Sequence, residues 1–283
     1  MFPAPIEHAS PAARTLYRLA VLATLALWLA PLAAVALTSV RPIEDLNRGN
    51  LWGWPSELAL LENYAAVLGG SRMGRFIANS FLVTLPAVAG AVAVSALAGF
   101  ALAKHAFPGN RALLAVFVAG NLVPFQVLMI PVRDLMLALG LYDTRWALIV
   151  FHVAFQTGFC TLFMRNFIRA LPDGLLETAR MEGAGELKVF WHVVLPLVRP
   201  AIAAVSVLVF TFVWNDYFWS LVLVQSDDVR PLTAGLQSLR GMWQTSWQLV
   251  SAASILAALP PVALFFLMQR HLITGLTFGA RRG

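Results

Sequence analysis

The chain has 283 residues, of which 59% are hydrophobic and only 12% are charged, and its mean hydropathy is +0.75. Soluble domains carry about 25% charged residues, so a chain of this length could not hide that much apolar surface from water, and lipid must solvate most of it. The net charge of +6 does not indicate nucleic-acid binding, because the basic residues cluster at the ends of apolar segments rather than on one soluble face.

Six apolar segments are long enough to cross a bilayer as helices, which takes about 20 residues each. In chain order they are approximately 17–40, 76–103, 112–139, 146–168, 201–224 and 249–268. Residues 1–16 precede them as a short N-terminal segment. The first apolar segment is longer than the core of a signal peptide, so an uncleaved anchor is favoured, although Ala34-Val35-Ala36 imitates a cleavage site. Prolines inside these segments predict kinks.

Basic residues indicate the orientation, since cytoplasmic loops carry an excess of Lys and Arg. With the N-terminus inside, the cytoplasmic ends are clearly positive and the opposite ends are slightly negative. The sequence therefore predicts a multi-pass membrane protein with both termini and the loop around 171–200 in the cytoplasm. The inward-facing basic residues are Arg14, Arg18, Lys104, Arg111, Arg165, Arg169, Arg180, Lys188, Arg199, Arg270, Arg281 and Arg282.

Motifs for catalysis, metals and nucleotides are missing from the sequence. Cys160 is the single cysteine, and the five histidines have no metal-ligand spacing. No G-x-x-x-x-G-K-[ST] occurs, and neither does G-x-S-x-G or H-E-x-x-H. We therefore expect a chain that is not an enzyme and holds no cofactor or metal of its own.

Polar side chains within the apolar segments are candidates for a substrate path, because such groups are costly in lipid and usually face a partner or a cavity. The ordinary alternative for each is an interhelical hydrogen bond. Asp216 stands apart, since an acid in a span needs a partner or water. The aromatic residues around it could stack on sugar rings or simply pack on other helices. The candidates are Asn79, Asn121, Gln126, His152, Gln156, Asn215, Asp216 and Tyr217.

The polar stretch 171–200 predicts a helical elbow between the fourth and fifth spans. Pro172 is suited to a helix start, and residues 174–182 form a first short helix. Gly183 and Gly185 supply the corner, and a second short helix runs from about 186 to 194 before Leu195-Pro196 stops it. An alternative is an amphipathic loop that packs on its own bundle or on the lipid surface.

The elbow resembles the EAA motif of permease subunits of bacterial ATP-binding-cassette importers. Glu177-Thr178-Ala179 stands for Glu-Ala-Ala, Glu182-Gly183 for Asp-Gly, and Leu195-Pro196 follows at the family spacing. The turn at 140–144, the Trp-Asn-Asp-Tyr-Phe-Trp element at 214–219 and the tail at 269–283 are similar to the second permease of the maltose-type sugar importers. The resemblance covers about residues 15–283.

This resemblance implies an all-α, multi-pass protein of the bacterial inner membrane, with the six-helix fold of type I importer permeases over residues 17–283. It also implies that a coupling loop at about 171–196 docks on a separate ATPase, which would bind the ATP and Mg. Further implied partners are a second homologous permease and an extracytoplasmic substrate-binding protein. The residues implied at the ATPase contact are Glu177, Ala179, Arg180, Met181, Glu182 and Gly183.

Three functions compete at this point. The first is import of a sugar or related polyol. The second is import of another small solute such as glycerol phosphate, which is less favoured because no basic residue lies centrally in any span. The third is an intramembrane enzyme, which is disfavoured because Asp216 has no second acid nearby in its span.

Overall fold

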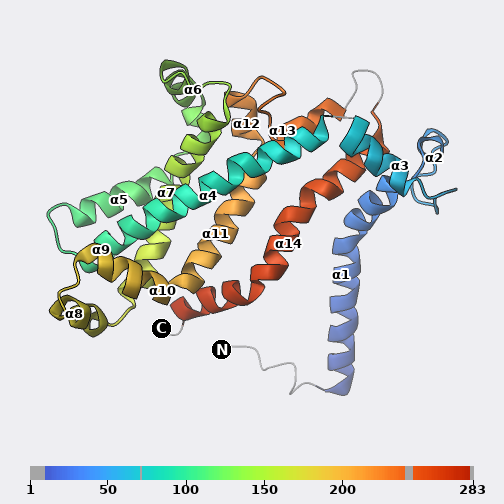
Figure 1. Cartoon of the computed structure of the whole chain (residues 1–283). Coiled ribbons are helices and arrows are strands. Elements are labelled where there is room, and N and C mark those ends of the chain that lie inside the picture. Colours follow the sequence, from blue (N-terminus) through green and yellow to red (C-terminus); the bar gives the residue numbers. More distant parts are fainter. Residues whose placement is uncertain (1–9, 71, 240–244, 281–283) are drawn as a thin grey trace. The chain divides into compact units, whose positions relative to one another are not determined.

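The computed structural model describes residues 10–70, 72–239 and 245–280, and these are organised as helices joined by turns (Figure 1). They form two compact units: the residues up to 71 together with 238–256, and residues 72–237 together with 257–283. The prediction of a single permease domain over 17–283 stays a prediction. Each unit is described by itself below.

The first unit begins with the long apolar helix α1, Pro11–Ser39. The hydroxyl of Ser10 accepts a hydrogen bond from the Ala13 backbone N–H, and Pro11 occupies the first turn. The helix therefore starts several residues before the predicted span. No residue of its most apolar stretch is buried within the chain. Such a surface suits contact with lipid or with a helix of another protein.

A compact polar cluster organises the segment after α1, which includes α2 (Ile43–Asn47), α3 (Leu60–Ala65) and a π-helical turn at Ala66–Gly70. Arg41 is fully buried, and its guanidinium donates to the backbone oxygens of Asn50, at 2.6 Å, and Gly53. The buried amide of Asn63 donates to the backbone oxygens of Ser39 and Arg41. Buried hydrogen bonds thus give this short segment a defined conformation without a large apolar core.

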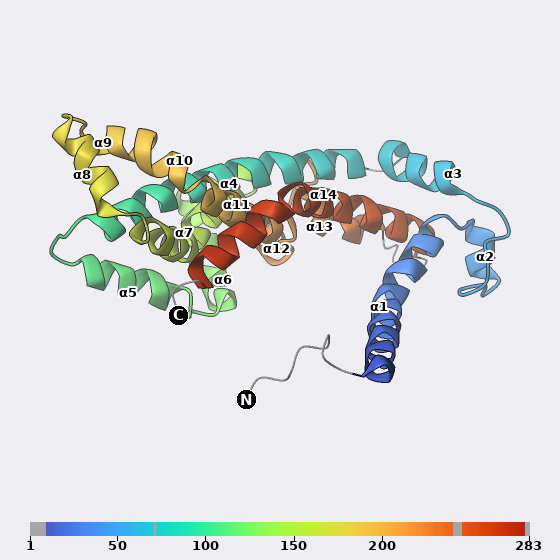
Figure 2. The ribbon, with the colours of Figure 1, turned by 90° about the horizontal axis from the view of Figure 1, so that it is seen from below.

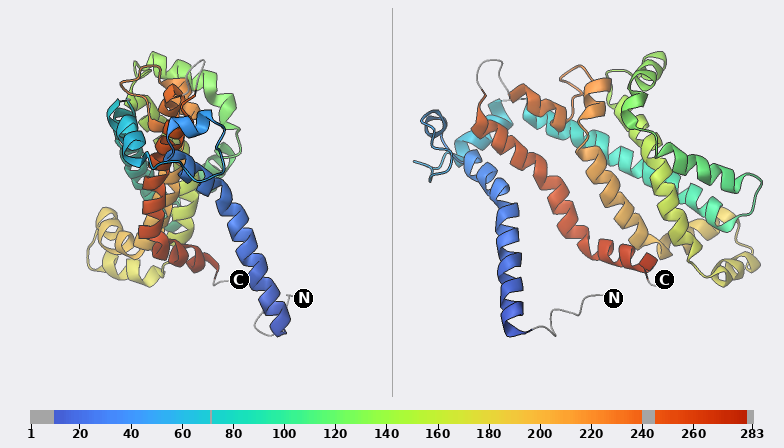
Figure 3. Two further views of the ribbon diagram at one scale, coloured as in Figure 1. Left: turned by 90° about the vertical axis from the view of Figure 1, so that its right-hand side faces the viewer. Right: turned by 180° about the vertical axis from the view of Figure 1, so that it is seen from behind.

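Three helices form the centre of the second unit: α4 (Met73–Lys104), α7 (Arg145–Arg169) and α11 (Arg199–Trp214). Helix α4 packs along α7 and also contacts α11 (Figure 3). Gly99 permits the close approach of α4 and α7, because a Cβ there would lie 2.9 Å from the backbone nitrogen of Arg165. These helices match the second, fourth and fifth predicted spans within a few residues at their starts.

The third predicted span is broken, which corrects the expectation of one helix over 112–139. Helix α5 (Asn110–Gly120) is followed by a 3₁₀ turn at Phe125–Leu128 and by α6 (Met129–Ala138), with a bend of 94° between the two arms. Pro124 lacks a backbone N–H and disfavours helical geometry in the residue before it, so the helix ends there. Apolar composition alone could not distinguish this bent pair from a straight span.

The fifth predicted span, 201–224, is also interrupted. Helix α11 ends at Trp214, and a new helix, α12 (Phe218–Leu223), starts after the short break at 215–217. The chain then forms α13 (Leu232–Gly235) and a 3₁₀ turn at Leu236–Leu239. The last helix, α14 (Trp247–Ala280), extends well past the predicted end at 268 and contains Pro260 and Pro261.

The described residues thus contain four helices that are long and apolar enough to cross a membrane, or up to six if each bent pair counts as one crossing. The second bent pair joins residues Glu186–Leu197 to Arg199–Trp214 at 78°. The chain therefore has six crossings, as predicted, only if each of the two bent pairs crosses the membrane as one span.

The elbow between α7 and α11 forms as predicted. It contains α8 (Asp173–Met181), α9 (Glu186–Val189), a π-helical turn at Phe190–Val194 and α10 (Leu195–Leu197). The predicted glycine corner is confirmed, since Gly183 has a φ of +84°. The second helical run continues past Leu195-Pro196 and bends only before Arg199. Figure 2 shows this elbow beyond the ends of α4 and α5.

Candidate functional site

A cavity of about 890 Å³ lies within the second unit, where the interrupted helices meet. Helix α7 supplies Phe151, His152, Phe155 and Gln156, and the break after α11 supplies residues 215–219. The bend after α5 contributes Phe125, and α14 contributes Phe265 and Gln269; Val207, Leu208, Thr211 and Phe212 complete the lining. Both departures from straight spans therefore place residues at this cavity.

Five of the predicted path residues line the cavity together. His152 and Gln156 lie one turn apart on α7, and Asn215, Asp216 and Tyr217 form the helix break opposite them. Asn215 and Tyr217 are exposed, whereas His152 and Gln156 are buried. The structure thus places polar groups from two helices on one cavity, as their positions within the spans suggested.

Asp216 has a structural role at the start of α12. Its carboxylate accepts hydrogen bonds from the backbone N–H groups of Trp219, at 3.2 Å, and Ser220, at 3.0 Å. These are the orphan donors that a helix N-terminus presents, so Asp216 caps α12. The capping explains why an acid is tolerated at this depth and why the chain can restart a helix after the break.

His152 lies beside this carboxylate. Its Nε2 is 3.6 Å from Asp216 Oδ2, slightly beyond hydrogen-bond distance, and its Nδ1 has no partner among the described residues. The His152 side chain is only 5% exposed. A buried ring nitrogen without a partner is unusual and leaves His152 with unused hydrogen-bonding capacity at the cavity wall.

Aromatic rings form much of the remaining wall. Phe151 packs on Trp219 with ring centroids 3.9 Å apart, and Phe125 meets Phe218 edge-on at 5.4 Å. The Tyr217 hydroxyl accepts a hydrogen bond of 2.8 Å from the amide of Gln237. A cavity that combines aromatic faces with a few placed polar groups suits a ligand with both apolar and hydrogen-bonding surfaces.

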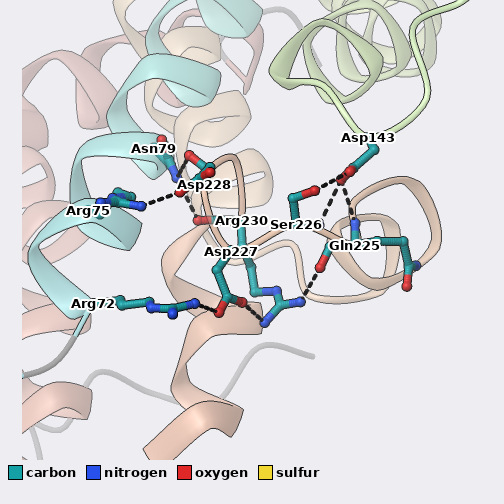
Figure 4. A network of polar contacts seen from close by, with 9 residues as sticks. All are labelled: Arg72, Arg75, Asn79, Asp143, Gln225, Ser226, Asp227, Asp228 and Arg230. Atoms are coloured by element: carbon teal, nitrogen blue, oxygen red, sulfur yellow. Dashed lines mark hydrogen bonds and ion pairs between the residues drawn. The ribbon is translucent and has the colours of Figure 1, made fainter.

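Asn79 is part of a different site, a polar network at the start of α4 (Figure 4). Its amide donates to the backbone oxygens of Asp228 and Arg230, at 3.0 Å each, and its oxygen accepts from Arg145 Nε at 2.9 Å. It therefore holds the segment after α12 against α4 and α7. The prediction that Asn79 shares a path with the other polar residues is not supported by this position.

The same network contains ion pairs across long sequence separations. Arg72 and Arg75 at the start of α4 pair with Asp227 and Asp228, and Arg230 also pairs with Asp227. Asp143, in the turn before α7, accepts from the backbone N–H groups of residues 225 and 226 at 2.7 and 2.8 Å. Partial burial acts to raise the pKa of Asp143, but hydrogen bonds from residues 225 and 226 outweigh it and lower this pKa below 3.8.

Asn121 and Gln126 also lie away from the cavity lining. The Asn121 amide donates to the Phe117 backbone oxygen at 2.7 Å and lies against Gly158 of α7, where a Cβ would come within 2.7 Å of it. Gln126 is exposed on the 3₁₀ turn, beside the lining residue Phe125. Asn121 thus bonds to its own helix and packs beside α7, and among the described residues it does not form the interhelical hydrogen bond of the ordinary alternative.

Sequence reasoning missed several lining residues. Thr211 precedes Asn215 by one helical turn, and Phe155 follows His152 by three residues, so helical spacing could have indicated both. Phe125 and Gln269 reach the cavity only because of a bend and a distant helix, which no local pattern reveals. Gln269 also donates to the backbone oxygen of Phe266 at 3.1 Å.

The elbow exposes most of the residues predicted at its partner contact. Glu177, Met181, Glu182 and Gly183 are exposed, with Met181 at 81%, while Ala179 is half-buried. Beneath them, Leu176 is buried on the opposite side of α8. An exposed face with a large apolar side chain at its centre is a surface suited to another protein.

Arg180, also predicted at the contact, is instead held within the elbow. The Glu186 carboxylate accepts from Arg180 Nε at 2.8 Å and from Nη2 at 3.1 Å, and its Oε2 lies 2.9 Å from His105 Nε2. This bidentate pair joins α8 to α9 and to the residue that ends α4.

A second contact joins the elbow to α4. Lys104 Nζ donates to the backbone oxygen of Leu171 and to Asp173 Oδ1, at 2.7 Å each, and the Lys104 side chain is only 6% exposed. The hydrogen bond from Lys104 holds the pKa of the Asp173 carboxyl below its usual 3.8. We call these two contacts, at Lys104–Asp173 and His105–Glu186–Arg180, the elbow clasps.

Together, broken apolar helices around a cavity and an exposed helical elbow define a membrane permease subunit. Residues 91–277 match the family model described as "Binding-protein-dependent transport system inner membrane component". Since the match covers more than half of the chain, this protein belongs to that family. It is therefore a membrane component of a transport system that works with a binding protein.

Relatives and a solved structure agree with this assignment. The chain is 34% identical over 268 residues to the osmoprotective compounds uptake permease protein GgtD of Synechocystis sp. (strain ATCC 27184 / PCC 6803 / Kazusa), over 93% of this chain and 90% of that protein. It is 31% identical over 256 residues to the arabinooligosaccharides transport system permease protein AraQ of Halalkalibacterium halodurans, over 89% and 91%. A chain of a bacterial ABC transporter involved in the import of the acidic polysaccharide alginate superimposes with a TM-score of 0.81 at 23% identity, over 94% of this chain and 99% of that one. The predicted type I importer permease fold is confirmed.

Proposed function

We propose that the chain is one of two permease subunits of an importer that moves an oligosaccharide or a related polyol into the cell. The observation that carries the cargo class is the cavity at the helix break, where aromatic walls meet polar groups from α7 and residues 215–217. Sugar rings present both C–H faces, which pack on aromatic rings, and hydroxyls, which need placed hydrogen-bond partners. The relative from Halalkalibacterium halodurans is named for the transport of arabinooligosaccharides, which supports the same class.

The cavity also bears on the alternative of a phosphorylated cargo. Among the described residues that line it, only His152 could carry a positive charge, and Asp216 lies beside that ring. An anionic cargo would gain little from such a lining, since buried anions need several cationic or N–H partners. This favours a neutral solute. The relative GgtD is named for osmoprotective compounds, and such a compound is the second candidate cargo.

Energy for transport would come from a separate ATPase, which would hold the ATP and Mg. The elbow at 171–196 would dock on it through the exposed residues of α8, with Glu177 and Gly183 at the contact. What supports this is the exposure of that face together with the elbow clasps, which connect it to α4. In this arrangement the elbow and both chain termini lie in the cytoplasm, while a second permease and an extracytoplasmic binding protein complete the importer.

Uptake measurements test the cargo assignment. The full importer, reconstituted in vesicles, is offered a panel of labelled oligosaccharides and polyols with Asn215→Ala or Tyr217→Phe in this chain. We expect either variant to lower uptake of the preferred sugar by about fivefold to tenfold, the effect of losing one or two hydrogen bonds. Gln126→Ala, at an exposed amide outside the cavity, is the matched control. Equal uptake by the cavity variants and the control for every transported solute would refute the assignment.

A charge reversal tests the coupling assignment separately. Glu177→Lys should abolish uptake while the binding protein still binds its ligand, because like charge and steric mismatch would disturb the docking surface. Glu62→Lys, at an exposed glutamate of α3, makes the same charge change away from the elbow. Single cysteines along α8 should also form crosslinks to the ATPase. Normal uptake with Glu177→Lys, or crosslinks only within the chain, would contradict the docking role.

A further inference from the structure

A second cavity, of about 860 Å³, lies between the C-terminal ends of α4 and α7 and the first turn of α5. Four basic side chains line it, and no acidic residue is among the described lining residues. Asp173 and Glu186 lie next to the lining, where they pair with Lys104 and His105. This second cavity is separate from the cavity at the helix break, because the two cavities share no lining residue. The four are Lys104, Arg111, Arg165 and Arg169.

Most of this positive charge is not neutralised by any residue that the structure describes. Lys104 is committed to the elbow clasp with Asp173. Arg165 has a single weak hydrogen bond, from Nε to the Leu102 backbone oxygen at 3.4 Å. Arg111 and Arg169 are exposed and form no hydrogen bond or ion pair with any residue that the structure describes. Guanidinium groups gathered on a concave surface without carboxylates are a recognition element for anions, and phosphate in particular matches their paired N–H donors.

The first turn of α5 adds to the positive electrostatic potential in this cavity. Gly109 precedes the helix with a φ of +88°, no side chain caps its N–H groups, and no acidic residue lies in that turn. The residues of this turn, Gly109 to Ala112, belong to the cavity lining. The partial positive charge of a helix N-terminus therefore reinforces the arginines.

We propose that this cavity binds the phosphate group of an anionic phospholipid. It lies at the ends of membrane helices, on the side that the charge distribution assigns to the cytoplasm, where basic pockets between helices take lipid headgroups. Phe107 in the cavity lining is 38% exposed, and exposed apolar side chains continue along α5, with Leu113 at 42% and Val116 at 64%. The charged part of the lipid would meet the arginines, and its acyl chains would lie along these side chains.

Lipid binding to the purified full chain in detergent tests this inference, and it does not depend on the cargo. Phosphatidylglycerol is titrated and its binding is followed by native mass spectrometry. Each basic residue near an anionic headgroup contributes a factor of about five, so Arg111→Gln with Arg169→Gln should weaken binding roughly thirtyfold. Arg14→Gln with Arg18→Gln, which removes the same charge from exposed residues outside the cavity, should change it less than about threefold.

Competition distinguishes the possible sources of the phosphate. Phosphatidylcholine should bind at least about tenfold more weakly than phosphatidylglycerol, and added salt should weaken the phosphatidylglycerol complex. Arg169→Lys, which keeps the charge, should bind more tightly than Arg169→Gln. Equal weakening in both double variants would overturn the site. Displacement of the lipid by an equal concentration of glycerol 3-phosphate would overturn the lipid assignment in favour of a soluble phosphate. Matching thermal unfolding midpoints of the variants confirm that folding is intact.

Discussion

The crossing of α4 and α7 allows a sharp test of the packing at the centre of the second unit. In Gly99→Ala, the new methyl group would lie 2.9 Å from the backbone nitrogen of Arg165 and 3.0 Å from Met164 Cβ. Neither atom can move by a side-chain rotation, so the two helices must separate locally. Overpacking of this kind costs about 1–3 kcal/mol.

Gly120→Ala provides the control for this change. Nothing lies within 4 Å of a Cβ at Gly120, which ends α5. The gain in helix propensity is at most about 1 kcal/mol in both variants, so it largely cancels when they are compared. Gly99→Ala should therefore be less stable than Gly120→Ala by about 1–3 kcal/mol, which corresponds to roughly 2–12 °C in unfolding midpoint for a chain of this size.

The measurement is thermal unfolding of the full chain in one detergent, followed by tryptophan fluorescence. Membrane proteins often unfold irreversibly, so all variants must be heated at one rate and compared by apparent midpoint. Met164→Ala combined with Gly99→Ala should not restore the midpoint, because the close contacts involve the backbone and Cβ. Equal midpoints for Gly99→Ala and Gly120→Ala would refute the close packing of α4 on α7.

Three further outcomes follow from local contacts. Because Lys104 lowers the pKa of Asp173, the stabilising contact is present above about pH 4 and is lost as the pH falls through the lower pKa of the folded state. Hydrogen exchange of the α8 backbone amides, corrected for intrinsic rates, should accelerate in that pH range. Lys104→Met should remove this pH dependence. Asp216→Ala should lower stability by about 1 kcal/mol through loss of the α12 cap, with Asp216→Asn milder, and unchanged unfolding midpoints for both would contradict the capping role. Gly183→Ala should cost about 1–2 kcal/mol because of its positive φ alone, since no atom lies near its Cβ position, and Gly183→Asn should cost less; the same midpoint measurement decides.

The elements that the sequence predicted well are those with strong local patterns. The spans around α4 and α7 follow from uninterrupted apolar runs, and the elbow follows from Pro172, Gly183 and the polar residues between them. His152 and Gln156 share a helix face because they are four residues apart, and this relation does not depend on tertiary structure.

The interruptions of the third and fifth spans were harder to predict, because a straight span and a bent one have the same apolar composition. Pro124 predicts a kink within one span, whereas the chain turns by 94° between α5 and the residues from Phe125 onwards. At the fifth span, Asp216 three residues before Trp219 is a capping arrangement, but its position within an apolar run concealed it. The pairing of Arg72 with Asp227 joins residues 155 positions apart, and no local pattern indicates such a contact.

The elbow clasps have a consequence for how displacement passes through the chain. A loop attached only at its two ends would deform when displaced, and the displacement would not reach the membrane helices. Because Lys104 and His105 bond both short helices to the end of α4, we expect the elbow and α4 to move together. A displacement of α8 would then reach the far end of this 32-residue helix.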